Sequence, residues 1–420
     1  MLFSKVGLLV SLAAAAVAAP VEQRALVPLR PSVDPFYQPP AGFESTAPGT
    51  VLKTRTIIPA LLGLLPSSLQ AYQLLYRTTS INGTAIATVT TVFKPLVANA
   101  TLDKFVSFHT AEDSSFVDCA PSYNYQLLAQ QTNAIVGFEA FIIQAYILKG
   151  YIVSSPDYES FDAAFGPGRL AGRGVLDSMR AVNNFATTLK LVSNNNAIVG
   201  IGYSGGAIAT GWAAALHNNY APELNIKGWS SGGTPANITG TALYIDNTTF
   251  SGFLPSAIVG LSTYNAYGTE LRPVIDSIIG PKGREALTFT SQNCATANLA
   301  KYPNTSIFGL DFQSLGKALF YQPTIAAILK DSTLGLVASE VPIAPVNLYH
   351  AINDEIIPYA NASTLYTNWC NQGGSVRFTS FTSGGHATTE IDNIARVQQF
   401  VADAFAGKVA SGCSAVTLEK

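Results

Sequence analysis

The chain has 420 residues, of which 48% are hydrophobic and 12% are charged, and its formal net charge is −2. This length is enough for one large core with an inserted subdomain or for two modest domains, so a short binding module is excluded. The charged share is about half the usual one, and no excess of basic residues offers an electrostatic footprint for nucleic acid.

The first 19 residues predict a secretory signal peptide. In "MLFSKVGLLVSLAAAAVAAP", Lys5 precedes a short apolar run, and small residues at Ala16 and Ala18 suit cleavage near Ala18 or Ala19. The alternative is a membrane anchor, but the run is shorter than the roughly 20 residues that a spanning helix needs. No later segment is apolar over such a length. We therefore expect a secreted, extracellular protein without a transmembrane segment.

A β-hairpin is the first structural element that the sequence predicts. The stretch "AYQLLYRTTSINGTAIATVTTVFKP" contains two strand-like runs joined through Asn82 and Gly83, two residues that tolerate the positive φ of a tight turn. A helical period follows over residues 174–192, "GVLDSMRAVNNFATTLKLV". Short apolar runs alternate with such helical stretches and predict further strands; they are "KFVSFHT", "GYIVSS", "NAIVGIGYS", "IKGWSS", "APVNLYHA" and "VRFTSF".

Alternation of strands and helices indicates an α/β fold with a mostly parallel central sheet flanked by helices. The alternation stops between residues 236 and 335, where the sequence is helical in character and rich in Phe, Tyr and Leu. We expect this interval to be a mainly helical cap inserted over the end of the sheet. The remaining core then consists of a first part, 20–235, and a second part, 336–420.

An oxidising secretory route permits the four cysteines to form disulfide bonds. None of them has a CxxC spacing, so a zinc site is not expected, and the residues by themselves leave three pairings open. Six Asn-x-Ser/Thr sequons fit the same route and predict exposed positions wherever a glycan is attached. The cysteines are Cys119, Cys294, Cys370 and Cys413, and the sequons are at Asn82, Asn99, Asn237, Asn247, Asn304 and Asn361.

The pentapeptide Gly202-Tyr203-Ser204-Gly205-Gly206 fits the nucleophile elbow G-x-S-x-G. It follows a strand-like run and precedes a helix-like one, which is the context that this motif requires. A serine on so sharp a turn needs neighbours without side chains, and the turn aims the Gly205 amide at the position where an oxyanion forms. The alternative is a glycine-rich turn with an incidental serine.

A nucleophilic serine needs a base, and the base needs an acid to orient it. His386 is the candidate base because we expect it on a glycine-flanked loop, "FTSGGHATTE", just after a predicted strand, where its ring can reach the serine. His109, His217 and His350 lie at strand ends or inside a helix, and we interpret His350 as structural. The order Ser, Asp, His that results is typical of α/β-hydrolases.

The candidate acid is Asp354 in "YHAINDEIIPY", just beyond a predicted strand end. Its distance from His386 along the chain leaves room for one helix and one strand. Glu355 is the second candidate for the same role. The alternative for Asp354 is an ordinary carboxylate on a solvated loop.

With these residues assembled, the chain resembles the secretory fungal lipase family of the α/β-hydrolase superfamily. The resemblance covers most of the chain after the signal peptide. It rests on "HTAEDSSFVDCAPSY", "GYIVSSPDYES", "GRGVLDSMRA", "GYSGG", "NDEIIPY" and "GGH", taken in this order. It implies that Ser204 is the nucleophile, His386 the base and Asp354 the orienting acid.

The resemblance further implies an oxyanion hole formed by the Gly205 amide and the side chain of Asp113, which would have to carry a proton in an apolar pocket. The alternative for Asp113 is a loop cap. The family's disulfide pattern implies pairing of Cys119 with Cys294 and of Cys370 with Cys413. Family members of the best-known type carry a long C-terminal extension with a flap near the active site, whereas seven residues follow Cys413 here, so the resemblance extends to the core chemistry but not to substrate size or interfacial behaviour.

The sequence therefore predicts a secreted serine ester hydrolase, a lipase that acts on triacylglycerol or other acyl esters without a metal or an organic cofactor. Its partners would be a lipid substrate and, transiently, a lipid interface. The alternatives are an esterase for short-chain or acetyl esters, a catalytically silent binding protein with the hydrolase fold, and a serine peptidase, which the triad alone does not exclude.

Overall fold

The computed structural model describes residues 27–67, 69–96 and 102–419. The predicted signal peptide and the sequon at Asn99 lie outside the described residues. Across the described ranges, the structure contains no helix with the length and apolarity needed to cross a membrane.

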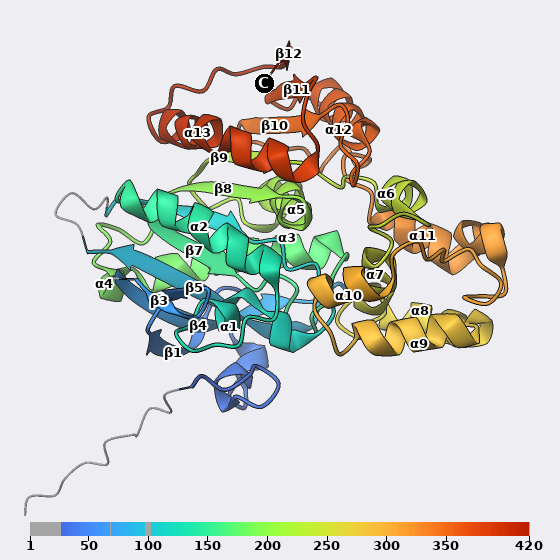
Figure 1. Cartoon of the computed structure of the whole chain (residues 1–420). Coiled ribbons are helices and arrows are strands. Elements are labelled where there is room, and N and C mark those ends of the chain that lie inside the picture. The colour runs from blue at the N-terminus through green and yellow to red at the C-terminus, as the bar shows by residue number, and fades with distance from the viewer. Residues whose placement is uncertain (1–26, 68, 97–101, 420) are drawn as a thin grey trace, which may run out of the picture.

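The core is a ten-stranded sheet whose strands follow the order β1-β4-β5-β7-β6-β8-β9-β10-β11-β12 (Figure 1). Strands β1, β4 and β5 form an antiparallel end, and β5 pairs antiparallel with β7. From β7 to β12 every neighbouring pair is parallel, so the sheet is mostly parallel, as predicted. The bounds are β1 Val51–Ile57, β4 Leu69–Thr79, β5 Ala85–Pro95, β6 Lys104–His109, β7 Ile152–Pro156, β8 Ala197–Tyr203, β9 Ile226–Gly232, β10 Val346–Ala351, β11 Val376–Phe381 and β12 Ser414–Leu418, with β2 Ala60–Leu61 and β3 Leu65–Pro66 forming a separate two-stranded hairpin.

The predicted hairpin is present as β4 and β5, which pair over their full length from Leu69 with Pro95 to Thr79 with Ala85. Gly83 closes its turn with φ of +89°, a conformation that favours glycine. All six later strand predictions are also confirmed. Two strands at the sheet edges, β1 and β12, were not anticipated by the apolar patterns.

Helices cover both faces of the sheet (Figure 1). One apolar core packs α3, α5 and α12 on the first face, and a second packs α2 and α13 on the other. The helical period over residues 174–192 is present as α3 and α4, although α3 begins earlier, at Gly168, and the two helices are separated at Phe185. The bounds are α1 Pro121–Asn124, α2 Ala134–Leu148, α3 Gly168–Asn184, α4 Ala186–Leu189, α5 Gly205–Tyr220, α12 Tyr359–Asn371 and α13 His386–Phe405.

Six further α-helices lie between β9 and β10 and form the side lobe of the molecule in Figure 1. This helical segment occupies the interval in which the sequence lost its alternation. Two apolar clusters hold the lobe together, and the first also includes Ile86 and Leu170 of the core. The bounds are α6 Ile238–Ile245, α7 Phe253–Leu261, α8 Gly268–Ile278, α9 Pro281–Thr290, α10 Ala295–Lys301 and α11 Pro323–Asp331.

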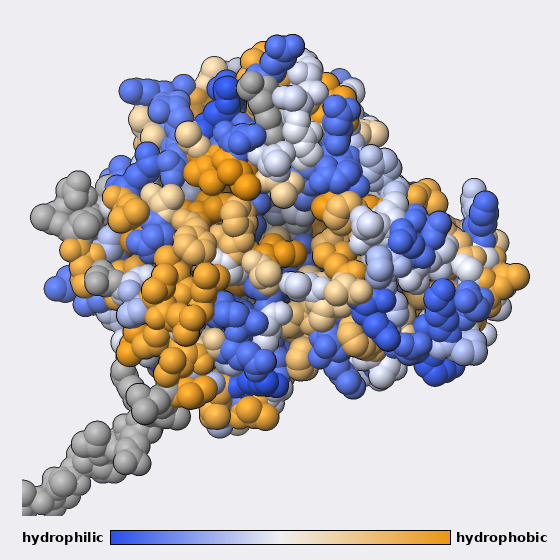
Figure 2. Space-filling view, viewed as in Figure 1, coloured by the Kyte–Doolittle hydropathy of each residue, from blue (hydrophilic) through white to orange (hydrophobic). Residues whose placement is uncertain are grey.

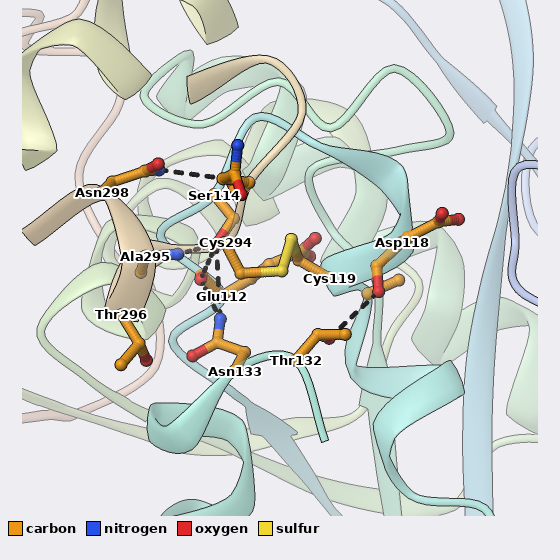
Figure 3. The surroundings of a disulfide bond; sticks show 12 residues. Glu112, Ser114, Asp118, Cys119, Thr132, Asn133, Cys294, Ala295, Thr296 and Asn298 are labelled. Atoms are coloured by element: carbon orange, nitrogen blue, oxygen red, sulfur yellow. Dashed lines mark hydrogen bonds between the residues drawn. A yellow bond between two sulfur atoms is a disulfide. The ribbon is translucent and has the colours of Figure 1, made fainter. Parts of the chain in front are cut away.

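Two disulfide bonds have the pairing that the family resemblance implied, Cys119 with Cys294 and Cys370 with Cys413. The first joins the segment after β6 to the start of α10, so it ties the core to the helical lobe (Figure 3). Hydrogen bonds reinforce this junction, since the Ser114 hydroxyl accepts from the Ala295 amide at 3.0 Å. The second joins α12 to the segment that leads into β12.

Candidate active site

Ser204 occupies the turn between β8 and α5. Its backbone has φ of +52°, a left-handed conformation that costs a non-glycine residue energy and that is characteristic of a strained elbow. The Ser204 amide donates to the Gly232 carbonyl at 3.0 Å, which anchors the turn to the end of β9. The side chain is half-buried, and α5 begins at the next residue.

The glycines around Ser204 are required by close packing. A Cβ at Gly206 would overlap the carbonyl oxygen of His109, at the end of β6, and a Cβ at Gly202 would overlap the Thr210 hydroxyl on α5. Strands β6 and β8 and helix α5 can therefore approach as closely as they do because these positions carry no side chain.

Asp113 lies directly against the elbow. It sits in the loop after β6 with φ of +52°, is 4% exposed, and its Oδ1 occupies the space that a Cβ at Gly205 would need. Burial raises the pKa of Asp113 to about 7, although the nearby His386 opposes the rise. Oδ1 has no hydrogen-bond partner among the described residues. Asp113 therefore brings a polar atom that is free to bind a ligand to the cavity that Ser204 also lines.

Asp354 and His386 form a direct pair. The His386 Nδ1 and the Asp354 Oδ2 lie 2.7 Å apart, and the carboxyl group is 1% exposed. The other oxygen, Oδ1, accepts from the amides of Ile356 and Ile357 at 2.9 and 2.8 Å. Because an ionised carboxylate can only accept, Nδ1 carries the proton and Nε2 keeps its lone pair.

The electrostatics of Asp354 favour the ionised form. Burial alone would raise the pKa of this carboxyl, but the hydrogen bond and charge of His386, together with His350 and the Ile357 amide, outweigh it and hold the pKa below its usual value. His350 donates from Nε2 to the Ile357 carbonyl at 2.9 Å, and burial lowers its pKa. His350 therefore supports the loop of Asp354, as the sequence interpretation expected.

His386 begins α13, rather than lying within a loop. Its carbonyl accepts from the Tyr203 hydroxyl at 2.8 Å, and its ring lies against Gly233, next to the residue that anchors the Ser204 amide. Nε2 is buried and forms no hydrogen bond with any described residue, Ser204 included. Hydrogen bonds of this kind are often long before substrate binds.

Among the described residues, the His386 ring forms its hydrogen bond with Asp354 and none with Glu355. The Glu355 Oε2 instead accepts from the His386 backbone amide at 2.9 Å, so it fixes the start of α13. The remaining histidines lie elsewhere: His109 bonds Ser107 and Thr210 inside the sheet layer, where burial lowers its pKa to about 3, and His217 bonds the Leu224 carbonyl.

A cavity with an empty volume of about 830 Å³, including its open mouth, leads from Ser204 into the helical lobe. Its lining is apolar except for Asp113, Ser204 and Thr241. The other lining residues come from the loops at the sheet end, from the start of α5 and from the lobe; they are Phe165, Gly166, Gly205, Ile208, Pro235, Ile238, Ala242, Ile245, Phe253, Leu254, Ala257, Ile258, Leu261, Ile307, Phe320, Leu329, Ile356 and Ile357.

Comparison with known proteins identifies the family. The model of the secretory lipase family matches residues 125–412. This chain belongs to that family. Among curated members, secreted triacylglycerol lipase LIP1 of Malassezia furfur is 41% identical over 94% of this chain and 80% of its own length, and LIP5 of Malassezia globosa is 39% identical over 92% and 81%.

Comparison with solved structures agrees with this family and identifies the fold. Candida antarctica lipase A is 32% identical, with a TM-score of 0.84 over 94% of this chain and 90% of that one. The esterase LipA of Xanthomonas oryzae, at 15% identity and a TM-score of 0.66, is a likeness of fold alone. This secretory lipase family member therefore has the α/β-hydrolase fold.

Three contacts at the site were not predicted from the sequence. Tyr203 holds the His386 carbonyl, Tyr244 of the lobe donates to the Asp354 carbonyl at 2.9 Å, and Glu139 of α2 accepts from the Ala111 amide at 2.8 Å. Each joins segments far apart in the chain. A tyrosine at position x of G-x-S-x-G gives the one local clue among them.

Of the described sequons, those at Asn82, Asn247 and Asn304 are exposed, while Asn237 is half-buried. Asn361 is buried. This side chain is 5% exposed, and its Nδ2 donates to the Asn237 carbonyl and to the Thr241 hydroxyl, so the nitrogen that would carry a glycan is already enclosed.

We predict that Gly205→Ala lowers kcat/KM for a soluble ester by about 100-fold, because the new Cβ displaces the Asp113 carboxyl. A double-mutant cycle with Asp113→Ala tests the cause. In the Asp113→Ala background, adding Gly205→Ala should lower kcat/KM by less than about threefold. Fully additive losses in the cycle would contradict this explanation.

Proposed function

We propose that this chain is a secreted triacylglycerol lipase that uses Ser204, His386 and Asp354 as a catalytic triad. The observation that carries the proposal is the buried Asp354–His386 pair beside a strained serine at the mouth of an apolar cavity. The names of the Malassezia relatives support the substrate class. The helical segment 236–335 then acts as a cap over the acyl site.

Acylation begins when Ser204 Oγ attacks the ester carbonyl carbon. The hydroxyl proton passes to His386 Nε2, whose lone pair is free, and the Oγ–C bond forms as the carbonyl oxygen becomes an oxyanion. Asp354 stays ionised and stabilises the imidazolium through Nδ1. The bond to the alcohol oxygen then breaks, and Nε2 returns the proton to that oxygen.

The oxyanion is held by the Gly205 amide, at the first position of α5, and by a protonated Asp113. A carboxylate would repel an oxyanion, so Asp113 serves only when it carries a proton, and its raised pKa keeps it protonated in acidic medium.

Deacylation repeats the chemistry with water. His386 removes a proton from a water molecule, the oxygen attacks the acyl carbon, and Ser204 leaves with the proton from Nε2. During this step the acyl chain occupies the cavity, whose aliphatic and aromatic lining suits an alkyl chain.

A contact with lipid surfaces is the finer part of the proposal. Five large apolar side chains, Leu62, Leu64, Leu65, Phe138 and Phe141, are between 38% and 72% exposed. They form one patch, since the tip of the β2–β3 hairpin packs beside α2, and Figure 2 shows apolar residues gathered over this region.

No Asp, Glu, Lys or Arg lies between residues 56 and 72, and the one in α2, Glu139, points inward. Such a patch matches an uncharged lipid surface rather than a charged partner. Because Glu139 reaches the Ala111 amide, the patch lies on the outer side of the helix that supports the Asp113 loop.

The first prediction here concerns substrate and nucleophile together. The protein should hydrolyse p-nitrophenyl esters from acetyl to palmitoyl as well as emulsified triacylglycerol, and Ser204→Ala should lose at least about 1,000-fold in kcat. Activity confined to acetyl and butyryl esters would indicate a short-chain esterase. Activity of Ser204→Ala within twofold of the parent would refute the triad.

A second prediction concerns pH. Asp113 has its pKa raised to about 7, so its donor is present below that pH and is lost as the pH rises through it. Asp113→Asn donates at every pH. Near pH 5 we expect the kcat of Asp113→Asn to be about tenfold lower than that of the parent protein. We also expect the fall of its kcat at alkaline pH to begin at a higher pH than in the parent. A decline at the same pH in both proteins would show that Asp113 does not set it.

The third prediction separates lipid contact from chemistry. Phe138→Ser/Phe141→Ser should reduce activity on emulsified triacylglycerol at least about fivefold more than activity on soluble p-nitrophenyl butyrate, because only the emulsion offers a surface. Val192→Ser, at an apolar residue that is 71% exposed and lies outside the patch, is the control. Equal losses on both substrates would count against the patch as a docking surface.

A further inference from the structure

Two carboxyl groups meet beneath the candidate site, between α2 and α13. Glu139 is 1% exposed, Glu390 is half-buried, and the two side chains are hydrogen-bonded to each other. Neither residue lines the apolar cavity, and neither belongs to the triad. Buried carboxyl groups are costly to place in a core, so their meeting calls for a physical explanation.

Two ionised carboxylates cannot hydrogen-bond to each other, so one of them carries the shared proton. Burial raises the pKa of Glu390 to about 7, and the negative charge of Asp113 adds to the rise while the His386 ring opposes it. Burial and the charge of Glu390 also raise the pKa of Glu139 well above its usual value. The pair therefore keeps its proton in acidic medium.

The other titratable groups that face the pair do not change its protonation. Tyr203 of β8, Tyr349 of β10 and Tyr146 of α2 have pKa values raised by burial first and then by neighbouring charges, so they remain neutral. Tyr125, near Glu139, behaves in the same way. Among the groups that lower the pKa of Glu390, the His386 ring has the largest effect.

The pair lies between the two halves of the proposed machinery. On one side, Glu139 Oε2 accepts from the Ala111 amide at 2.8 Å, two residues before Asp113 in the same loop. On the other side, Glu390 lies one helical turn after His386, the first residue of α13. A hydrogen bond between Glu139 and Glu390 therefore connects the Asp113 loop to the His386 helix.

We propose that Glu139 and Glu390 are positioning residues, a proton-sharing carboxyl pair that fixes the distance between Asp113 and His386 around the reacting ester. The inference rests on the triad and oxyanion hole of the proposed function. When the shared proton is lost, two buried negative charges repel each other, and the Asp113 loop and α13 lose their link. Because the pair does not touch the substrate cavity, its loss lowers kcat and leaves KM nearly unchanged.

Glu390→Leu and Glu390→Gln test the pair on soluble p-nitrophenyl butyrate. Leu keeps a similar volume but cannot hydrogen-bond, and we expect kcat at pH 6 to fall at least about tenfold with KM within about threefold. Gln can donate to the Glu139 carboxylate at every pH, so it should recover most of the loss. Glu139→Gln should behave like Glu390→Gln, since its amide can both accept from Ala111 and donate to Glu390.

The pH readout uses Asp113→Asn as the parent, which removes the titration of Asp113 itself. Adding Glu390→Gln to this parent should move the remaining alkaline decline upward by at least one pH unit, because the pair can no longer carry two negative charges. Asp403→Asn, the same loss of charge farther along α13, is the control and should move nothing.

Thermal unfolding of each variant identifies a general loss of fold. The proposal is wrong if Glu390→Leu keeps kcat within twofold, or if Glu390→Gln is as impaired as Glu390→Leu and leaves the alkaline decline in place. Should Glu390→Leu fail to fold, the two Gln variants decide the matter alone. A failure of the proposed function would be seen separately, as activity that survives Ser204→Ala.

Discussion

The site depends on one steric constraint, the absence of side chains around Ser204. Gly202 and Gly206 let β6, β8 and α5 close to backbone contact, and Gly205 leaves the space into which the Asp113 carboxyl fits. The strained backbone of Ser204 persists because the surrounding packing and the bond to the Gly232 carbonyl fix it. Any side chain added here would separate the serine from the groups that serve it.

Burial raises the pKa of each carboxyl group at the site, and the hydrogen-bonding and charged partners of each group decide the net direction of its shift. Asp354 receives two backbone amides and the His386 ring, so it remains an acceptor despite its burial. Asp113 and Glu390 receive no comparable set of donors, and burial raises the pKa of each to about 7. One hydrolase can thus hold an ionised carboxylate and protonated carboxyl groups around the same histidine.

Local patterns in the sequence were sufficient where a residue's environment is set by its neighbours in the chain. The alternation around β8 and the glycines of the elbow predicted that strand and its turn, and the family's motifs implied the Cys119–Cys294 bond. Burial by distant segments was not readable: the helix predicted over 174–192 breaks near Phe185, and Asn361 is enclosed by Asn237 of another element. Glu139 is likewise hidden in an apolar helix, because its partners come from other parts of the chain.

The central claim is that Ser204 is the activated nucleophile, and covalent labelling tests it most directly. The protein would be treated with a fluorophosphonate, digested, and its peptides analysed by mass spectrometry. The account predicts one adduct, on the peptide that contains Ser204, which is lost in His386→Ala as well as in Ser204→Ala. An adduct on another serine, or an unlabelled protein that still hydrolyses esters, would contradict it.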